Sequence, residues 1–157
     1  MSTLPVPGPE ALAHSARQAT HIRDAIDAAG GWLSFARYME LALYAPGLGY
    51  YAAGATKFGQ AGDFTTAPEM SALFGRALAR QVAQVLEGGD IMEIGAGSGK
   101  LAADLLLELE RLGALPPRYD ILELSGELKA RQQATLTVRA PHLLERVRWL
   151  DHLPETF

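Results

Sequence analysis

Apolar residues recur along this chain in two patterns, one typical of amphipathic helices and the other of short buried strands. In the first third of the chain, helical spacing predicts two helices, over residues 10–29 and from Phe35 to about Leu43. Ser34 stands where it can cap the second helix, and Pro46 ends it. We therefore expect the chain to open with a helical region.

A longer helix is predicted from Thr66 to Leu86, closed by the two glycines at positions 88 and 89. Thr66 and Glu69 have the spacing of a capping box, and Pro68 is tolerated in a first helical turn. The apolar residues of this segment repeat at helical spacing, and we expect their stripe to pack on a sheet. The stripe consists of Leu73, Phe74, Ala77, Leu78, Val82, Val85 and Leu86.

The rest of the chain alternates short apolar runs with amphipathic segments. Strands are predicted at 91–94, 119–124 and 147–150, with helices at 101–112 and 126–138 between them. Short links between such elements require right-handed crossovers and a parallel sheet. The fold class is therefore α/β, with three parallel strands and their helices preceded by a helical N-terminal region. The first of the two helices is expected to bury a seam of Leu101, Leu105, Leu109 and Leu112.

Composition narrows the function classes. The 157 residues include 48% apolar and 20% charged residues, as in an ordinary globular domain. Fourteen basic and eighteen acidic residues give a net charge of −4, so we expect no nucleic-acid partner. Cysteine is absent, and no run of 18 apolar residues or secretory signal is found, which leads us to expect no membrane span and a cytoplasmic location.

Two histidines are the first candidates for a metal site. His14 and His21 lie seven residues apart on one face of the first predicted helix. No third ligand or acidic neighbour has the spacing that a metal ion requires. We interpret both as residues of the polar helix face and expect no metal.

The strongest chemical signal is a glycine turn that joins the first predicted strand to its helix. It reads Glu93-Ile94-Gly95-Ala96-Gly97-Ser98-Gly99, and a second carboxylate, Glu123, follows in the next strand. Alternating glycines let the backbone turn sharply and let a ligand approach bare amide groups at a helix N-terminus. This turn is the predicted binding site.

Two phosphate-binding motifs fit the turn poorly. A P-loop requires glycine at the place of Ile94 and serine or threonine at the place of Leu101. A dinucleotide fingerprint can be aligned on Gly97, Gly99 and Ala102, but it leaves unused the glycine that directly follows the strand. The remaining pattern, a strand-end acid before three alternating glycines and a second acid on the next strand, resembles the cofactor motif of class I S-adenosylmethionine-dependent methyltransferases.

Three further stretches are similar to the MidA-type family of these enzymes. They are residues 35–51, which end in Gly-Leu-Gly-Tyr-Tyr, residues 62–71, which read Gly-Asp-Phe-Thr-Thr-Ala-Pro-Glu-Met-Ser, and residues 119–132. The resemblance runs from about Trp32 to the last residues. It implies a Rossmann-like fold with S-adenosyl-L-methionine as cofactor. In the mitochondrial branch it also implies protein arginine methylation during the assembly of respiratory complex I.

The resemblance also implies roles for particular residues. The cofactor would contact Glu93, Gly95, Ala96, Gly97, Gly99 and Glu123, with the two ribose hydroxyls donating to Glu123, and Asp63 would lie in a loop near the cofactor. Catalytic residues are not identified by these motifs. The expected partner is a protein substrate, and a homo-oligomer is possible.

The family resemblance stops at the third predicted strand. Family members continue into a fourth-strand motif and a substrate-binding insertion, so we expect this chain to be the N-terminal part of a longer enzyme and inactive alone. The predicted organisation is a disordered tail at 1–9, a helical region and loop at 10–64, and the first half of the cofactor-binding domain at 65–157. Two alternatives stay open, a non-catalytic binding or assembly module and a dinucleotide-dependent oxidoreductase.

Overall fold

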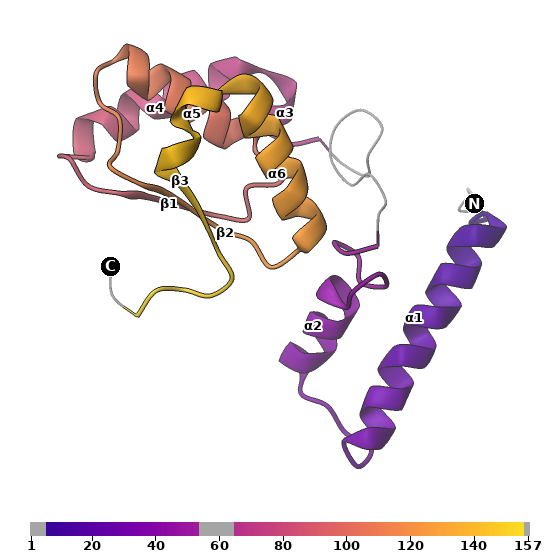
Figure 1. Ribbon diagram of the computed structural model, residues 1–157. Helices are drawn as coiled ribbons and strands as arrows, with labels where there is room; N and C mark the ends of the chain where they lie inside the picture. Colours follow the sequence, from indigo (N-terminus) through magenta and orange to yellow (C-terminus); the bar gives the residue numbers. More distant parts are fainter. Residues whose placement is uncertain (1–5, 54–64, 156–157) are drawn as a thin grey trace, which may run out of the picture. The chain divides into compact units, whose positions relative to one another are not determined.

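A computed structural model describes residues 6–53 and 65–155 of the chain, which divides into two compact units (Figure 1). Residues 1–54 form the first unit and residues 55–157 form the second. The first five residues of the predicted disordered tail lie outside the described part. Within the described residues, no helix combines the length and the apolar character needed to cross a membrane.

The first unit is a pair of helices, α1 (Pro9–Ala28) and α2 (Phe35–Tyr44), as the hydrophobic spacing predicted. Ser34 caps α2, since its side chain accepts a hydrogen bond from the Arg37 amide at 3.2 Å. The Gln18 amide joins the two helices by donating to the Leu41 carbonyl at 2.8 Å. His14 Nε2 lies 2.8 Å from the Leu48 carbonyl oxygen, so this histidine has a polar contact within the unit.

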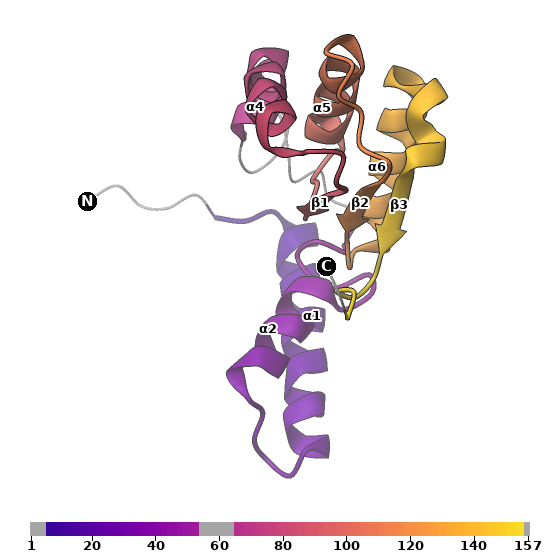
Figure 2. The same cartoon turned by 90° about the vertical axis from the view of Figure 1, so that its left-hand side faces the viewer.

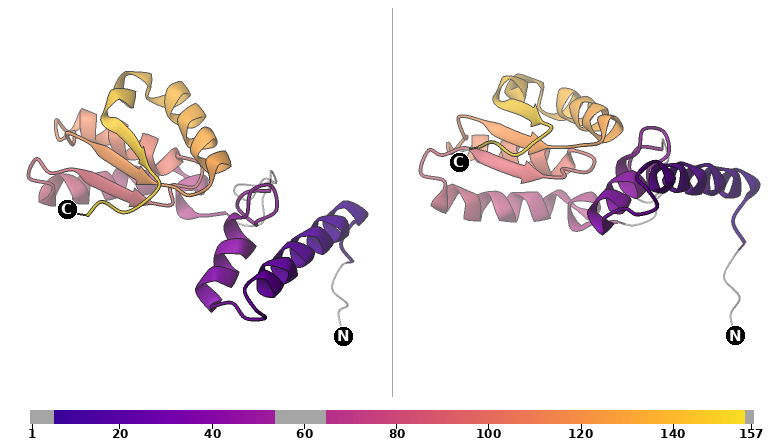
Figure 3. Two further views of the ribbon diagram at one scale, coloured as in Figure 1. Left: turned by 60° about the horizontal axis from the view of Figure 1, so that its bottom comes forward. Right: turned by 90° about the horizontal axis from the view of Figure 1, so that it is seen from below.

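The second unit contains a parallel sheet of three strands, in agreement with the prediction. The strands are β1 (Ile91–Ile94), β2 (Tyr119–Leu122) and β3 (Val147–Leu150), and they lie side by side in the order β1-β2-β3 (Figure 3). Ile91 pairs with Tyr119, and Tyr119 pairs with Val147. The second strand ends at Leu122, two residues earlier than predicted, so Glu123 follows the strand directly.

Helices α4 (Ala72–Val85), α5 (Lys100–Arg111) and α6 (Gly126–Arg139) lie along one face of this sheet (Figure 2). A short 3-10 helix, η1 (Pro141–Arg146), connects α6 to β3 and was not predicted. Leu105 and Leu109 are buried as expected, whereas Leu112 is 38% exposed because it follows the end of α5. Besides Leu105 and Leu109, the core includes the fully buried residues Ala102, Ala103, Leu106, Tyr119, Ile121 and Leu136.

The long helix predicted from Thr66 to Leu86 is wrong, because the segment is broken into α3 (Ala67–Met70) and α4. Ser71 interrupts it with extended backbone angles, φ −158° and ψ 142°, and its hydroxyl caps α4 by accepting from the Leu73 amide at 3.1 Å. The capping box is also absent, since the Thr66 side chain makes no cap hydrogen bond and the Glu69 carboxylate is engaged elsewhere.

The predicted packing of the apolar stripe of α4 on the sheet is wrong as well. Leu73 is 70% exposed and Val85 is 76% exposed, whereas Gly75 and Ala79 are buried. A Cβ atom at Gly75 would lie 2.5 Å from the Cβ atom of Asp104 on α5. The helix therefore packs closely on α5 through its small residues, because large side chains have no room there.

Candidate functional site

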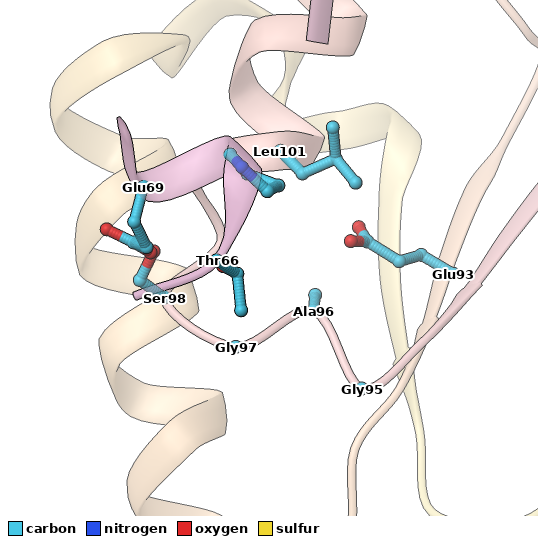
Figure 4. A pocket seen from close by; sticks show the side chains of 9 residues that line it. Thr66, Glu69, Glu93, Gly95, Ala96, Gly97, Ser98 and Leu101 are labelled. Carbon is cyan, nitrogen blue, oxygen red and sulfur yellow. The ribbon is translucent and has the colours of Figure 1, made fainter. Parts of the chain in front are cut away.

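A cavity of about 220 Å³ lies where β1 ends and α5 begins (Figure 4). Its walls come from the glycine turn, from β1 and α5, and from the segment that leads into α3. The lining residues are Thr66, Pro68, Glu69, Glu93, Gly95, Ala96, Gly97, Ser98 and Leu101. The volume is below the roughly 300–1,000 Å³ that encloses a drug-sized ligand, so this cavity can take one end of a ligand of that size.

The glycine turn leaves open space beside its backbone. Gly95 and Gly97 have left-handed φ angles of +70° and +55°, and a Cβ atom built on either would meet no atom within 4 Å. Residues that carry a side chain rarely adopt such backbone angles, which accounts for glycine at both positions. A ligand can therefore approach the bare backbone there.

Gly99 is required for a different reason. Its φ angle is +79°, and a Cβ atom there would lie 2.9 Å from Cα of Gln132 on α6. Real Cβ contacts are essentially never this short. The third glycine thus allows α6 to pack against the turn, and it does not line the cavity.

Glu93 brings a half-buried carboxylate to the cavity wall. Figure 4 shows its side chain pointing into the space bounded by Ala96 and Leu101. The Tyr119 hydroxyl donates to Glu93 Oε2 at 2.8 Å. Burial raises the pKa of Glu93, and the Tyr119 hydrogen bond opposes that rise only in part. Burial and the neighbouring carboxylate also raise the pKa of Tyr119 well above its usual value, so Tyr119 acts as a donor.

The α3 segment is attached to the turn by two hydrogen bonds. The Ser98 hydroxyl donates to the Glu69 carboxylate, and Lys100 Nζ donates to the Glu69 carbonyl oxygen at 2.9 Å. Lys100, which follows Gly99 as the lysine of a P-loop follows its last glycine, therefore supports the cavity wall. No lysine or arginine is among the described residues that line the cavity, so no side-chain cation is present there to pair with a phosphate group.

Glu123 lies next to the turn and outside the lining of the cavity. Its side chain is buried, with Oε1 accepting from the Ser125 amide at 2.9 Å and Oε2 accepting from Gln132 Nε2 at 2.8 Å. The same Gln132 nitrogen donates to the Gly97 carbonyl oxygen at 3.2 Å. Because each carboxylate oxygen has two acceptor positions, one on each remains for a ligand hydroxyl.

These features fit the cofactor that the sequence motifs implied. An ammonium or sulfonium group is attracted to a carboxylate on the cavity wall such as Glu93, and a diol can donate to the two oxygens of Glu123. The open backbone at Gly95 and Gly97 and the lack of basic lining residues suit a ligand without phosphate groups. The residues present therefore match S-adenosylmethionine better than a dinucleotide.

Four of the seven predicted site residues line the cavity together, namely Glu93, Gly95, Ala96 and Gly97. Gly99 and Glu123 lie beside it and are joined to it through Gln132. Asp63 lies outside the described residues. Within the described residues, no group of three or more His, Asp or Glu side chains is arranged to hold a metal ion.

Sequence reasoning missed Gln132, Tyr119 and the wall formed by Thr66, Pro68 and Glu69. The signal for Gln132 is its place between Leu128 and Leu136, where a helix repeat of four predicts a buried face. All three residues of this stripe are buried, and a polar residue on such a face requires hydrogen-bond partners.

Comparison with known proteins identifies the family. A family model with the description "Putative S-adenosyl-L-methionine-dependent methyltransferase" matches residues 73–157, more than half of the chain. The chain belongs to this family.

Two solved structures are similar to nearly the whole chain. A protein from Burkholderia thailandensis bound to S-adenosyl-homocysteine is 56% identical, with a TM-score of 0.84 over 99% of this chain and 42% of that chain. A native crystal structure from the same bacterium is 54% identical, with a TM-score of 0.78 over 99% of this chain and 40% of that chain. These likenesses establish the Rossmann-like methyltransferase fold.

Curated relatives include the bovine protein named "Protein arginine methyltransferase NDUFAF7, mitochondrial". It is 34% identical over 117 residues, which are 68% of this chain and 26% of the bovine protein. The rat protein of the same name is 35% identical over 117 residues, 68% of this chain and 27% of that protein. This chain thus spans about a quarter of the length of the curated relatives that it matches.

Proposed function

We propose that this chain binds S-adenosylmethionine in an enzyme that methylates a protein, with arginine as the methylated residue. The observation that carries the proposal is the cavity itself, where Glu93 and the open backbone of Gly95 and Gly97 meet without a basic side chain. Membership of the methyltransferase family and the S-adenosyl-homocysteine bound to a 56% identical protein support the choice of cofactor. The names of the curated relatives support arginine.

Several residues in and beside the cavity have separate parts in holding the cofactor. The Glu93 carboxylate attracts its cationic amino-acid end, and the bare backbone at Gly95 and Gly97 leaves room for it. Glu123, fixed by Ser125 and Gln132, accepts from the ribose hydroxyls. The hydrogen bonds from Ser98 and Lys100 to Glu69 hold the α3 wall against the turn.

When bound, the cofactor would supply a methyl carbon activated by its sulfonium. A guanidinium nitrogen of the substrate would bond to this carbon as the carbon–sulfur bond breaks, which leaves S-adenosylhomocysteine and releases one proton from the nitrogen. Such a displacement depends chiefly on the alignment of the reacting atoms. The residues described here therefore contribute by fixing the position of one reactant. No acceptor-side base is assigned to them.

Calorimetry with the full-length protein tests the cofactor. S-adenosylhomocysteine is expected to bind, and NADH is expected to give no heat of binding. Tighter binding of NADH would contradict the proposal and restore the oxidoreductase alternative. Absence of binding to either ligand would favour a non-catalytic module.

A transfer assay tests the substrate class. The full-length protein is incubated with S-adenosylmethionine labelled in the methyl group and with a protein extract from cells that lack its gene. Acid hydrolysis of the labelled protein is expected to yield methylarginine. Label in another amino acid would keep the methyltransferase activity and reject arginine, and label only in small molecules would reject a protein substrate.

A further inference from the structure

Gln132 is a fully buried polar residue to which none of the sequence motifs assigns a role. It lies in the middle of α6, and its relative exposure is 0%. Its side-chain amide contacts three separate parts of the second unit, the residue after β2, the glycine turn and β3. Buried amides require partners, so these contacts determine where the side chain lies.

The donors and acceptors around Gln132 fix which end of its amide faces which partner. The Trp149 indole can only donate, and its Nε1 lies 3.0 Å from Gln132 Oε1. The Gln132 Nε2 group must then face the other side, where it donates to Glu123 Oε2 at 2.8 Å and to the Gly97 carbonyl at 3.2 Å. Both hydrogen atoms of the amide nitrogen are used.

The backbone of Gln132 makes a second contact with the turn. A Cβ atom on Gly99 would lie 2.9 Å from Gln132 Cα and 3.2 Å from its carbonyl oxygen. One residue of α6 thus touches the turn on both sides of Ser98, through its side chain at Gly97 and its backbone at Gly99. The position of the turn and that of the Glu123 carboxylate are therefore set by the same residue.

We propose that Gln132 is a positioning residue for the ribose end of the cofactor. Its amide holds Oε2 of Glu123, the Ser125 amide holds Oε1, and the carboxylate keeps one acceptor position on each oxygen for two adjacent hydroxyls. This inference rests on the proposed cofactor. It adds that Gln132 acts through Glu123 without contacting the reacting atoms.

The test compares two ligands that differ only at the ribose. S-adenosylhomocysteine and its 2′,3′-dideoxy analogue are titrated into the full-length protein and into the Gln132→Leu variant. Loss of a hydrogen bond to a charged group costs about tenfold in affinity or more. We expect Gln132→Leu to weaken the binding of S-adenosylhomocysteine by about tenfold, with a smaller effect on the dideoxy analogue.

Two variants calibrate the comparison. Glu123→Ala removes the carboxylate and is expected to show the same selective loss. Gln133→Leu changes the neighbouring glutamine of α6, whose side chain is exposed, and is expected to bind both ligands as the wild type does. Equal losses for the two ligands in Gln132→Leu would show a general structural role and overturn the proposal.

Folding is checked by circular dichroism before each titration. If Gln132→Leu does not fold, Gln132→Met keeps the length of the side chain, and Trp149→Phe removes the indole donor that orients the amide while it keeps an aromatic ring. Unchanged selectivity in every variant that folds also overturns the proposal. If Glu123→Ala shows no selective loss, the assignment of Glu123 to the ribose is rejected, but the proposed cofactor is not. If the wild-type protein binds neither ligand, the proposed function itself is rejected.

Discussion

At the scale of single residues, the two strand-end carboxylates have unlike surroundings. Glu93 faces the cavity with one hydrogen bond from Tyr119, and burial raises its pKa. Glu123 is held by hydrogen bonds at both oxygens and lies beside the turn. The sequence shows two similar acids, and only the folded chain distinguishes Glu93, which faces the cavity, from Glu123, whose two oxygens are held by hydrogen bonds.

Glu93→Gln is expected to change protein stability and cofactor affinity in opposite directions. Because the folded state raises the pKa of Glu93 above its ordinary 4.5, the folded chain holds this proton more tightly than the unfolded chain. Ionisation of Glu93 therefore lowers the free energy of unfolding as the pH rises from about 4.5 through the raised pKa. The variant keeps an acceptor for Tyr119 and should be more stable than the wild type at pH 7.

The same variant should bind S-adenosylhomocysteine about tenfold more weakly, since an amide replaces the charge that faces the ammonium group. In the wild type, affinity should fall as acid protonates Glu93. Thermal unfolding and calorimetry between pH 4 and pH 8 measure both effects. Glu145→Gln, at an exposed site on η1, is the control and should change neither quantity. A stable variant with unaltered affinity would exclude Glu93 from the site.

Gly97→Ala should abolish cofactor binding without unfolding the sheet. No atom of the chain would meet the new Cβ, so the cost to folding is the left-handed angle alone, about 1–2 kcal/mol. The methyl group instead occupies the space that the cofactor needs. Gly88→Ala is the matched control, because Gly88 also has a left-handed φ of +79° and open space, but it does not line the cavity. Equal affinities of the two variants would contradict the assignment.

At the scale of elements, α4 shows the difference between an apolar stripe and a packed face. The spacing of its large apolar residues predicted burial, yet the face that packs on α5 is made of Gly75 and Ala79. Helix axes approach closely only where the side chains between them are small. The spacing of apolar residues along α4 shows which of its faces is apolar, but it contains no information on how closely α5 approaches.

Gly75→Ala is therefore expected to lower the free energy of unfolding, although alanine favours helices. The new Cβ would lie 2.5 Å from Asp104 Cβ, and overpacking of this kind costs about 1–3 kcal/mol. Gly126→Ala, also in a helix but with no atom near its Cβ, should be neutral or slightly stabilising. Urea unfolding of the two variants makes the comparison, and a stabilised Gly75→Ala would contradict the close packing.

Ser71→Ala tests the break between α3 and α4. The Ser71 hydroxyl caps α4 by accepting from Leu73, and loss of such a cap costs about 1 kcal/mol. If the continuous helix predicted from the sequence existed, alanine at this position would stabilise it. The sign of the change in urea unfolding thus separates the two arrangements.

At the scale of the whole molecule, the chain divides into two units, and all the residues of the described cavity belong to the second. Hydrogen exchange with S-adenosylhomocysteine is therefore expected to slow at the glycine turn, at the start of α5 and at Glu123. We expect no such effect in the middle of α1. Protection confined to residues 1–54 would contradict this location of the site.

Three further predictions concern the whole molecule. The cytoplasmic location, the possible homo-oligomer and the division of the chain at residue 64 rest on the sequence alone. The curated relatives carry mitochondrial names and match this chain over about a quarter of their own length, 26% for the bovine protein. Measurement of the mass of the native assembly in solution and localisation in cells are the direct tests.

The sequence by itself determined the order of the elements, the parallel sheet and the glycine turn. These follow from the local periods of apolar residues, from glycines and capping residues, and from the short links that permit few topologies. The tertiary structure alone decided which partners each polar group finds. The Glu69 carboxylate accepts from Ser98 and forms no capping box, and Lys100 donates to the Glu69 carbonyl oxygen in α3. Gln132 forms hydrogen bonds with three segments that are far apart in the sequence. Such choices depend on contacts between residues far apart in the chain, and no local pattern contains them.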